Sequence, residues 1–363
     1  MKKLINILFD IYEVLGYNRE KQEGRQNLRK FFSLILALLC LFSLFSCGDG
    51  ESGKENTRLF YDYFDTWGTL YDFSGARYSD FSKVADEVEK ILKEYHELCD
   101  IYNKYEGKNN LATVNEMAGR GPVEVDEKLI ELLEYSKEIY YLTNGETNVA
   151  FGSVLKIWHE YREAGVDVPD ITELEEANLH TDIEKMVINH SLGTVELLDS
   201  RMSLDVGAVA KGYAVEMVAE YLKEKELSSY FFDMGGNLRA IGEKSNGVPF
   251  SSAVQNVVLG GYAARFELFD SALVTSGSYV RYYTVDGINY HHIIDKDTLF
   301  PKNDYVSVSV KATSSALADA LSTALFNMDI QEAEVLLGKL TGVSAVFVKP
   351  DGQVVKIEAG LSH

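Results

Sequence analysis

Two oxygen-bearing side chains, Asp319 and Thr323, stand four residues apart in the apolar segment 314–326 (SSALADALSTALF). On a helix they share one face and can present a carboxylate and a hydroxyl to a single hard cation. Mg²⁺ favours such oxygen ligands, and Mn²⁺ also suits them. The alternative is a carboxylate that favours the helix dipole and a threonine that bonds back to its own helix. For this pair taken alone, the alternative is the more common arrangement.

A second segment, 204–216 (LDVGAVAKGYAVE), has the features of an anion site. Small residues at 207, 208, 210 and 212 allow a ligand to approach the start of a helix, where free backbone N–H groups attract anions. Lys211 adds a positive charge, so the segment can hold a pyrophosphate. Close packing of the helix on a sheet would explain the small residues equally well. Met234-Gly235-Gly236-Asn237 follows an apolar strand and is a weaker signal, since most glycine pairs only form turns.

Segment 290–295 (YHHIID) brings a titratable imidazole close to a carboxylate. His292 lies three residues before Asp295, a combination suited to proton transfer near neutral pH. An isolated histidine on a strand is more often structural. The nearby carboxylate favours a catalytic role for His292.

The elements that must position these residues follow from apolar periodicity. Segments 81–95 and 126–142 show helical spacing, with Asp126 as the expected N-cap of the second helix and Gly145 just beyond its end. Short strands are expected at 194–198, 229–234 and 306–310, and a hairpin at 343–357. The pattern predicts an α+β protein of mixed α/β character, with a strand-rich second half.

The N-terminus has the composition of an export signal. Residues 31–45 are apolar and uncharged, basic residues precede them, and Cys47 follows. The run is shorter than the roughly 20 residues of a membrane span. The expected organisation is an export signal over 1–46, a tether over 47–59 and an enzyme domain over 60–358. An uncleaved signal anchor is the alternative, and either one leaves the domain outside the cytoplasm and attached to the membrane.

Charge argues against a nucleic-acid-binding protein, and cysteine content argues against a disulfide-stabilised one. The net charge is −21, and segment 1–46 is itself basic, so the remaining chain is more acidic still. This argues against nucleic acid as a partner. Of the three cysteines, Cys40 lies in the signal and Cys47 at the lipidation position, which leaves Cys99 without a partner. No disulfide framework is expected.

Taken together and in this order, the segments resemble the FAD:protein FMN transferases, the ApbE-type flavin transferase family. DVGAVAKGYAVE is similar to the family's Asp-x-Gly-x-x-Ala-Lys-Gly-Tyr-Ala helix, YHHIIDKDTLFP to its Tyr-x-His-Ile-Ile-Asp-Pro-x-Thr-Gly-x-Pro segment, and ALADALSTALF to its Ala-Asp-Ala-Leu-Ala-Thr-Ala motif. Weaker similarity includes Gly68-Thr69, the stretch from Tyr105 and the segment 145–158. Departures are Trp67 for methionine, 148–150 (NVA) for Asp-Pro-Thr, and Lys296 and Leu299 for proline and glycine. The end of the apolar run, Leu44 to Cys47, resembles a bacterial lipobox with Cys47 as the lipidated residue.

The resemblance implies a fold of two closely associated subdomains around a central cleft, with a T-fold-like architecture. It implies Mg²⁺ held by Asp319, Thr323 and the backbone carbonyl of Ala208, with Lys211 on the FAD pyrophosphate. His292 would be the general base, held in place by Asp295. The positions implied to contact FAD are Trp67, Thr69, Tyr105, Asn148, Lys211, His292 and Ile293.

The implied reaction attaches FMN from FAD, through a phosphoester bond, to a threonine or serine of an exported redox protein and releases AMP. The same residues would serve an FAD pyrophosphatase that yields FMN and AMP. A non-catalytic flavin-binding lipoprotein is the third hypothesis, suggested by the lipobox and by the altered Lys296 and Leu299.

Overall fold

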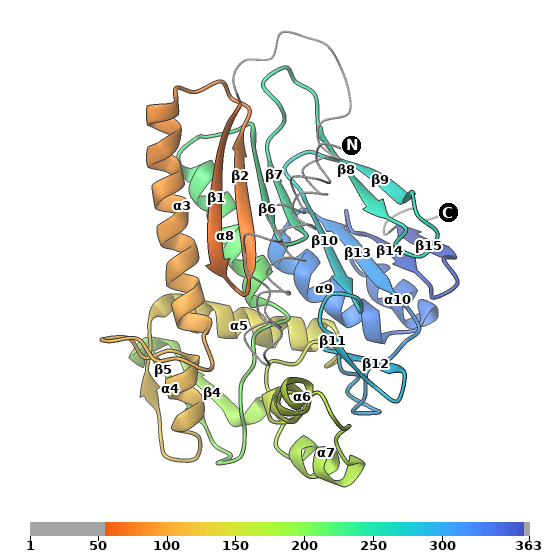
Figure 1. The fold of residues 1–363 in the computed structure, drawn as a ribbon. Coiled ribbons are helices and arrows are strands. Elements are labelled where there is room, and N and C mark those ends of the chain that lie inside the picture. Colours follow the sequence, from red (N-terminus) through yellow and green to blue (C-terminus); the bar gives the residue numbers. More distant parts are fainter. Residues whose placement is uncertain (1–54, 359–363) are drawn as a thin grey trace, which may run out of the picture. The chain divides into compact units, whose positions relative to one another are not determined.

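An eight-stranded antiparallel sheet forms the centre of the computed structural model, which describes residues 55–358 (Figure 1). Its strand order is β1-β2-β6-β7-β10-β13-β14-β15. The strands are β1 (Asn56–Tyr63), β2 (Thr66–Asp72), β6 (Tyr230–Met234), β7 (Asn237–Ile241), β10 (Ala272–Gly277), β13 (Ser307–Ala312), β14 (Ser344–Val348) and β15 (Val354–Glu358).

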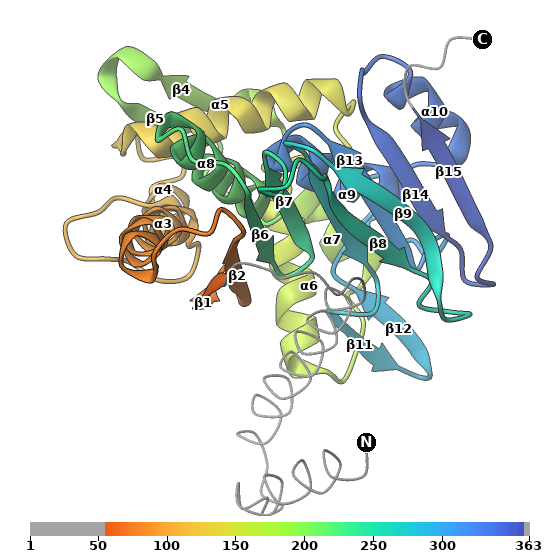
Figure 2. The ribbon, with the colours of Figure 1, turned by 90° about the horizontal axis from the view of Figure 1, so that it is seen from above.

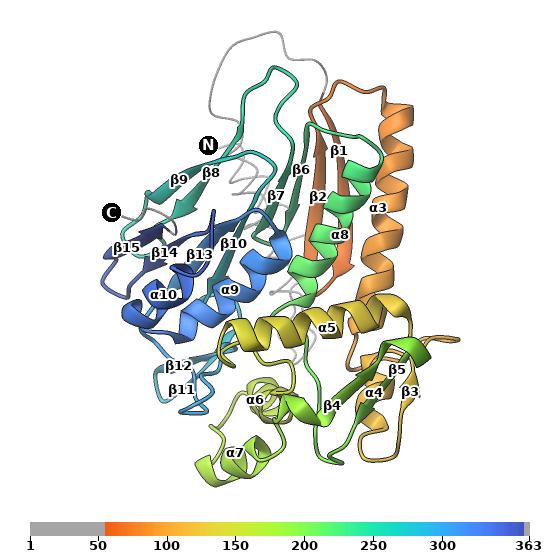
Figure 3. The same ribbon diagram turned by 180° about the vertical axis from the view of Figure 1, so that it is seen from behind.

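Helices cover one face of this sheet, as Figure 3 shows from behind. They are α3 (Tyr78–Cys99), α8 (Ala210–Glu224), α9 (Ser315–Asn327) and α10 (Ile330–Leu337). Phe81 and Val215 from α3 and α8 pack with Phe232 of β6 in one apolar cluster. Leu325 of α9 and Phe347 of β14 belong to a second cluster. Burial of these side chains fixes the helices on the sheet.

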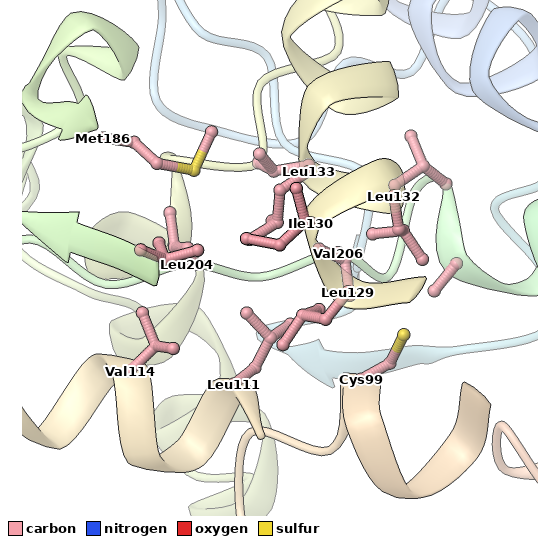
Figure 4. Close-up of a cluster of buried hydrophobic side chains, with 14 of the residues drawn as sticks. Cys99, Leu111, Val114, Leu129, Ile130, Leu132, Leu133, Met186, Leu204 and Val206 are labelled. Carbon is pink, nitrogen blue, oxygen red and sulfur yellow. The ribbon is translucent and has the colours of Figure 1, made fainter. Parts of the chain in front are cut away.

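A second group of elements lies at one end of α8. It contains α4 (Leu111–Glu116), α5 (Glu127–Leu142), α6 (Gly152–Ala164), α7 (Ile171–Asn178), the 3-10 turns η1 (Ile183–Lys185) and η2 (His190–Leu192), and a small sheet ordered β3 (Val123–Glu124), β5 (Thr194–Leu197), β4 (Met186–Asn189). Figure 4 shows part of its core, where Leu129 and Ile130 of α5 pack with Leu204 and Val206. The loop that leads into α8 is therefore anchored in an apolar core.

Two hairpins complete the described part of the chain. The hairpin β8 (Phe250–Gln255) and β9 (Tyr262–Leu268) lies beside β14 (Figure 2). The hairpin β11 (Tyr282–Val285) and β12 (Ile288–His291) stacks Tyr290 on Trp158 of α6, with 5.9 Å between ring centres. Because β12 leads directly into His292, packing against α6 sets the position of that histidine.

Most elements predicted from the sequence are confirmed, including the mixed α/β architecture. Asp126 is the N-cap of α5, where its side chain accepts a hydrogen bond from the Lys128 N–H at 2.9 Å. The predicted tether, by contrast, extends too far, because β1 begins at Asn56 and its first residues pair with β2. The boundary is hidden in the sequence because Asn56 is polar, yet its amide donates to Asp72 at 2.9 Å.

The predicted signal, Cys47 and the tether up to residue 54 lie outside the described residues. The described residues 55–358 lie within one compact unit. Among residues 55–358, no helix is both long and apolar enough to span a membrane.

Candidate active site

The first turn of α8 meets the middle of α9 at Asp319. The Gly212 backbone N–H donates to Asp319 Oδ2 at 2.7 Å, and Lys211 Nζ lies 2.9 Å from Oδ1. The carboxylate is 6% exposed. A free N–H at a helix start and a lysine are the groups that attract an anion, so the carboxylate is held by positive charge on both oxygens.

Glycine is required at position 212 for this contact. A Cβ atom there would lie 2.3 Å from the Asp319 Cβ and 2.6 Å from the Ser315 carbonyl oxygen. Both distances are shorter than atoms can approach without moving, so any side chain would separate α8 from α9. The small residue predicted to face an anion therefore also serves close helix packing.

The donor set at this junction fits a hard cation. Each Asp319 oxygen can accept more than one bond, so the contacts with Lys211 and Gly212 leave lone pairs for a metal ion. Thr323, one turn later on α9, is half-buried, and its hydroxyl makes no hydrogen bond within residues 55–358. Ser322, instead, bonds back to the Asp319 carbonyl at 2.9 Å. The carbonyl of Ala208 precedes α8. Carboxylate, hydroxyl and carbonyl oxygens are the ligands that Mg²⁺ prefers.

Asp233 is a site residue that the sequence reasoning missed. It lies opposite Thr69 in the β2–β6 pair, directly before the Met234-Gly235-Gly236 turn. Burial raises its pKa to about 6, although the Gly236 N–H at 3.3 Å and the charge of Lys211 oppose the shift. Thr69 therefore lies beside Asp233 in the sheet, and the charge of Lys211 acts on its carboxylate. Its position at a strand end before two glycines is the signal that could have found it.

His292 follows β12 and has a defined tautomer. Its Nδ1 lies 3.2 Å from the carbonyl oxygen of Arg281, and its backbone N–H donates to the same carbonyl at 3.1 Å. A carbonyl only accepts, so Nδ1 carries the proton and Nε2 keeps a free lone pair. Burial, with a smaller effect of the Arg281 charge, lowers the pKa of His292 to about 3. The imidazole is therefore neutral at physiological pH, with Nε2 unprotonated.

The structure corrects the role assigned to Asp295. Its Oδ1 accepts from the backbone N–H of Thr298 at 2.7 Å, and its Oδ2 lies 3.1 Å from Lys302 Nζ. Within the described chain no hydrogen bond joins it to His292. Asp295 caps the turn that follows the histidine instead of holding the imidazole, because its side chain bonds forward along the chain.

The two departures from the family pattern in this turn are both accommodated by tertiary contacts. Lys296, in place of proline, lies 3.2 Å from Glu146 in the loop before α6. Leu299, in place of glycine, has φ +61° and is 4% exposed. Its carbonyl accepts from the Trp158 indole N–H at 2.9 Å. Burial and this hydrogen bond hold a leucine in a backbone conformation that glycine adopts more easily.

The residues predicted to contact the flavin are dispersed. Trp67 is half-buried, with its ring edge-on to Tyr61 at 5.3 Å between ring centres. The Tyr105 hydroxyl donates to Asp100 at 2.8 Å. Asn148 uses its amide on the Thr181 carbonyl and the Ala150 N–H, both at 2.9 Å. Ile293 is buried in the cluster under α9. The side chains of Asn148 and Ile293 therefore serve local structure.

A second polar group, also missed from the sequence, joins α6 to the loop that follows α3. Arg162 and the Tyr102 hydroxyl both reach His159 Nδ1, at 2.9 and 3.0 Å. Burial raises the pKa of Asp205, which the Gly207 N–H at 2.8 Å and the charges of His159, Arg162 and Arg281 partly offset. The loop before α8 thus carries a half-buried carboxylate near the charges of Arg162 and Arg281.

Comparisons with known proteins give one consistent result. The ApbE family model matches residues 67–347. An FAD:protein FMN transferase of Treponema pallidum is 33% identical over 352 residues, which is 90% of this chain and 93% of the relative. An FAD:protein FMN transferase of Klebsiella pneumoniae is 28% identical and covers 77% of this chain and 86% of its own.

Two solved structures share the fold. The ApbE protein of Thermotoga maritima has a TM-score of 0.75 and 25% identity, and covers 84% of this chain and 97% of its own. The flavin transferase ApbE of Vibrio cholerae has a TM-score of 0.73 and 24% identity. It covers 85% of this chain and 97% of its own.

Proposed function

This chain belongs to the ApbE family and is an FAD:protein FMN transferase, and we propose that its activity depends on Mg²⁺ held by Asp319, Thr323 and the Ala208 carbonyl. The observation that carries the metal proposal is the contact of Asp319 with the positive first turn of α8, through Gly212 and Lys211. A buried carboxylate beside a lysine and a helix N-terminus is a place where a cation and a pyrophosphate can meet.

The transfer step follows from the groups around this junction. The hydroxyl oxygen of an acceptor threonine or serine attacks the phosphorus on the FMN side of FAD. The bond from that phosphorus to the bridging oxygen breaks, and the bridging oxygen leaves with AMP. His292 Nε2 takes the hydroxyl proton, since Nδ1 is already protonated against Arg281.

The chain's own residues hold the substrate in this scheme. Lys211 and the positive end of the α8 dipole bind the pyrophosphate, and Thr69 lies on β2, the strand next to β6. When bound, Mg²⁺ neutralises the charge that develops on the departing AMP. Asp295 keeps the turn after His292 in place through Thr298 and Lys302. Trp67 and Tyr105 remain our candidates for stacking on the flavin ring.

The metal proposal is tested by removal and substitution. With Mg²⁺ chelated, AMP release in the presence of acceptor should stop, and restored Mg²⁺ or Mn²⁺ should recover it. Asp319→Asn should lower the rate by about 100-fold or more even at high Mg²⁺, because a neutral amide is a poor ligand for a hard cation. AMP release that continues in chelator at the wild-type rate would contradict the metal requirement.

We also propose that the protein is exported and lipidated at Cys47, and that its acceptor is an exported redox protein. The apolar run 31–45, its basic flank and the following cysteine support this. Radiolabelled fatty acid should enter the wild-type protein in a bacterial host and should not enter Cys47→Ser. Equal labelling of both would exclude Cys47 as the lipidated residue.

A further inference from the structure

A buried ion pair lies beneath the first turn of α9. Arg239 of β7 is fully buried, and its Nε and Nη2 atoms donate to the two carboxylate oxygens of Glu216 on α8, at 3.1 and 3.0 Å. The remaining nitrogen, Nη1, donates to the Ala240 carbonyl at 2.6 Å and to Asp270 at 3.1 Å. Because the guanidinium is rigid and bonded on all sides, it fixes the direction of the Glu216 carboxylate.

Glu216 also reaches the backbone of α9. Its Oε2 accepts the N–H of Ser315, the first residue of that helix, at 2.5 Å. This N–H is among those that a helix leaves without an internal partner, and it lies at the positive end of the helix dipole. A buried carboxylate is therefore well placed to hold the start of α9.

Helix α9 lies beside α8 (Figure 3), and the same face of α8 holds it at a second point, one turn away on each helix. Gly212 precedes Glu216 by four residues, and Asp319 follows Ser315 by four. Gly212 bonds Asp319 while Glu216 bonds Ser315, so the two helices are joined in antiparallel register. Ser315 and Asp319 are one turn apart in α9, and a helical turn is rigid. A shift of α9 at Ser315 must therefore move the Asp319 carboxylate relative to Gly212.

We propose that Glu216 is a positioning residue for the metal site. Oriented by Arg239, it sets the register of α9 against α8 that brings Asp319 to Gly212 and Lys211. This inference rests on the proposed function, because the register matters to catalysis through the role of Asp319 as a metal ligand.

The test is the Mn²⁺ affinity of the folded protein with FAD bound, measured from the electron paramagnetic resonance signal of free Mn²⁺. Glutamine has the size of glutamate but offers a single acceptor oxygen, whereas Arg239 and the Ser315 N–H both require acceptors. Glu216→Gln should therefore weaken Mn²⁺ binding by about 10-fold or more. The matched control is Glu220→Gln, one turn further along α8, where an exposed glutamate pairs with Lys223. It should bind Mn²⁺ as the wild type does.

A purely structural role predicts a different result. Glu216→Gln would then melt at a lower temperature yet bind Mn²⁺ as tightly as the wild type, and this outcome would overturn the inference. If that variant does not fold, Arg239→Lys tests the inference in the same assay. Lysine keeps the buried positive charge but cannot donate two parallel hydrogen bonds to the Glu216 carboxylate. It should also bind Mn²⁺ more weakly, and unchanged binding would again overturn the inference. An Asp319→Ala variant that binds like the wild type would contradict the proposed function instead.

Discussion

At the residue scale, His292 must be a neutral base in the free protein if it is to accept the hydroxyl proton. The Arg281 carbonyl fixes the proton on Nδ1, and burial with the nearby guanidinium lowers the pKa of His292 to about 3. The neutral form therefore persists above that pH, and protonation removes the base only as pH falls towards 3. An anionic pyrophosphate bound nearby would raise this pKa.

The expected pH profile follows from the lowered pKa of His292. Because kcat/KM reports groups of the free enzyme, kcat/KM for FAD should show no loss attributable to His292 between about pH 8 and pH 5. His292→Gln should lower kcat by about 100-fold or more, whereas His190→Gln, at an exposed surface histidine, should not. An acidic limb near the ordinary histidine pKa of about 6.5 that disappears in His292→Gln would contradict this.

At the scale of elements, the closest approach in the site is that of α8 to α9. Gly212→Ala would place a Cβ 2.3 Å from the Asp319 Cβ, so the helices must separate. We expect a loss of about 1–3 kcal/mol in the free energy of unfolding, together with a higher Mg²⁺ requirement. The control is Gly338→Ala, at a position with φ −61° that alanine adopts freely. If Gly212→Ala had the same Mg²⁺ dependence as the wild type, the close contact between α8 and α9 would not be needed for metal binding.

The turn after His292 gives a second prediction at this scale. Leu299→Gly should relieve a left-handed conformation worth about 1–2 kcal/mol, but it also removes a buried side chain, for which truncation costs about 2–5 kcal/mol. The loss of packing is the larger effect, so the variant should unfold at lower denaturant concentration. Chemical denaturation checks this, and a stabilised variant would mean that strain outweighs packing.

A contact in the candidate site could be predicted from the sequence when its two residues are close together in one helix. Contacts between distant elements could not. Asp319 and Thr323 could be paired because helix geometry fixes a four-residue spacing. Asp295 was misassigned because nearness in sequence to His292 does not imply a contact, and its carboxylate caps the following turn. Glu216 and Arg239 could not be paired, since their contact depends on how α8 packs on β7.

At the scale of the whole molecule, an acidic chain must gather its positive groups locally to accept an anionic dinucleotide. The net charge is −21, yet Lys211 and the start of α8 meet at Asp319. The acidic surface disfavours polyanions such as nucleic acid. At this site the charges of the metal and the pyrophosphate would compensate each other.

The most direct test of the central claim is the intact mass of an acceptor protein after incubation with FAD, Mg²⁺ and this enzyme. We expect an acceptor heavier by FMN less one water, attached at a threonine or serine, with one AMP released for each flavin gained. Asp319→Asn should leave the acceptor mass unchanged. Steady release of FMN and AMP, with the acceptor unmodified, would contradict transfer and identify the activity as hydrolysis.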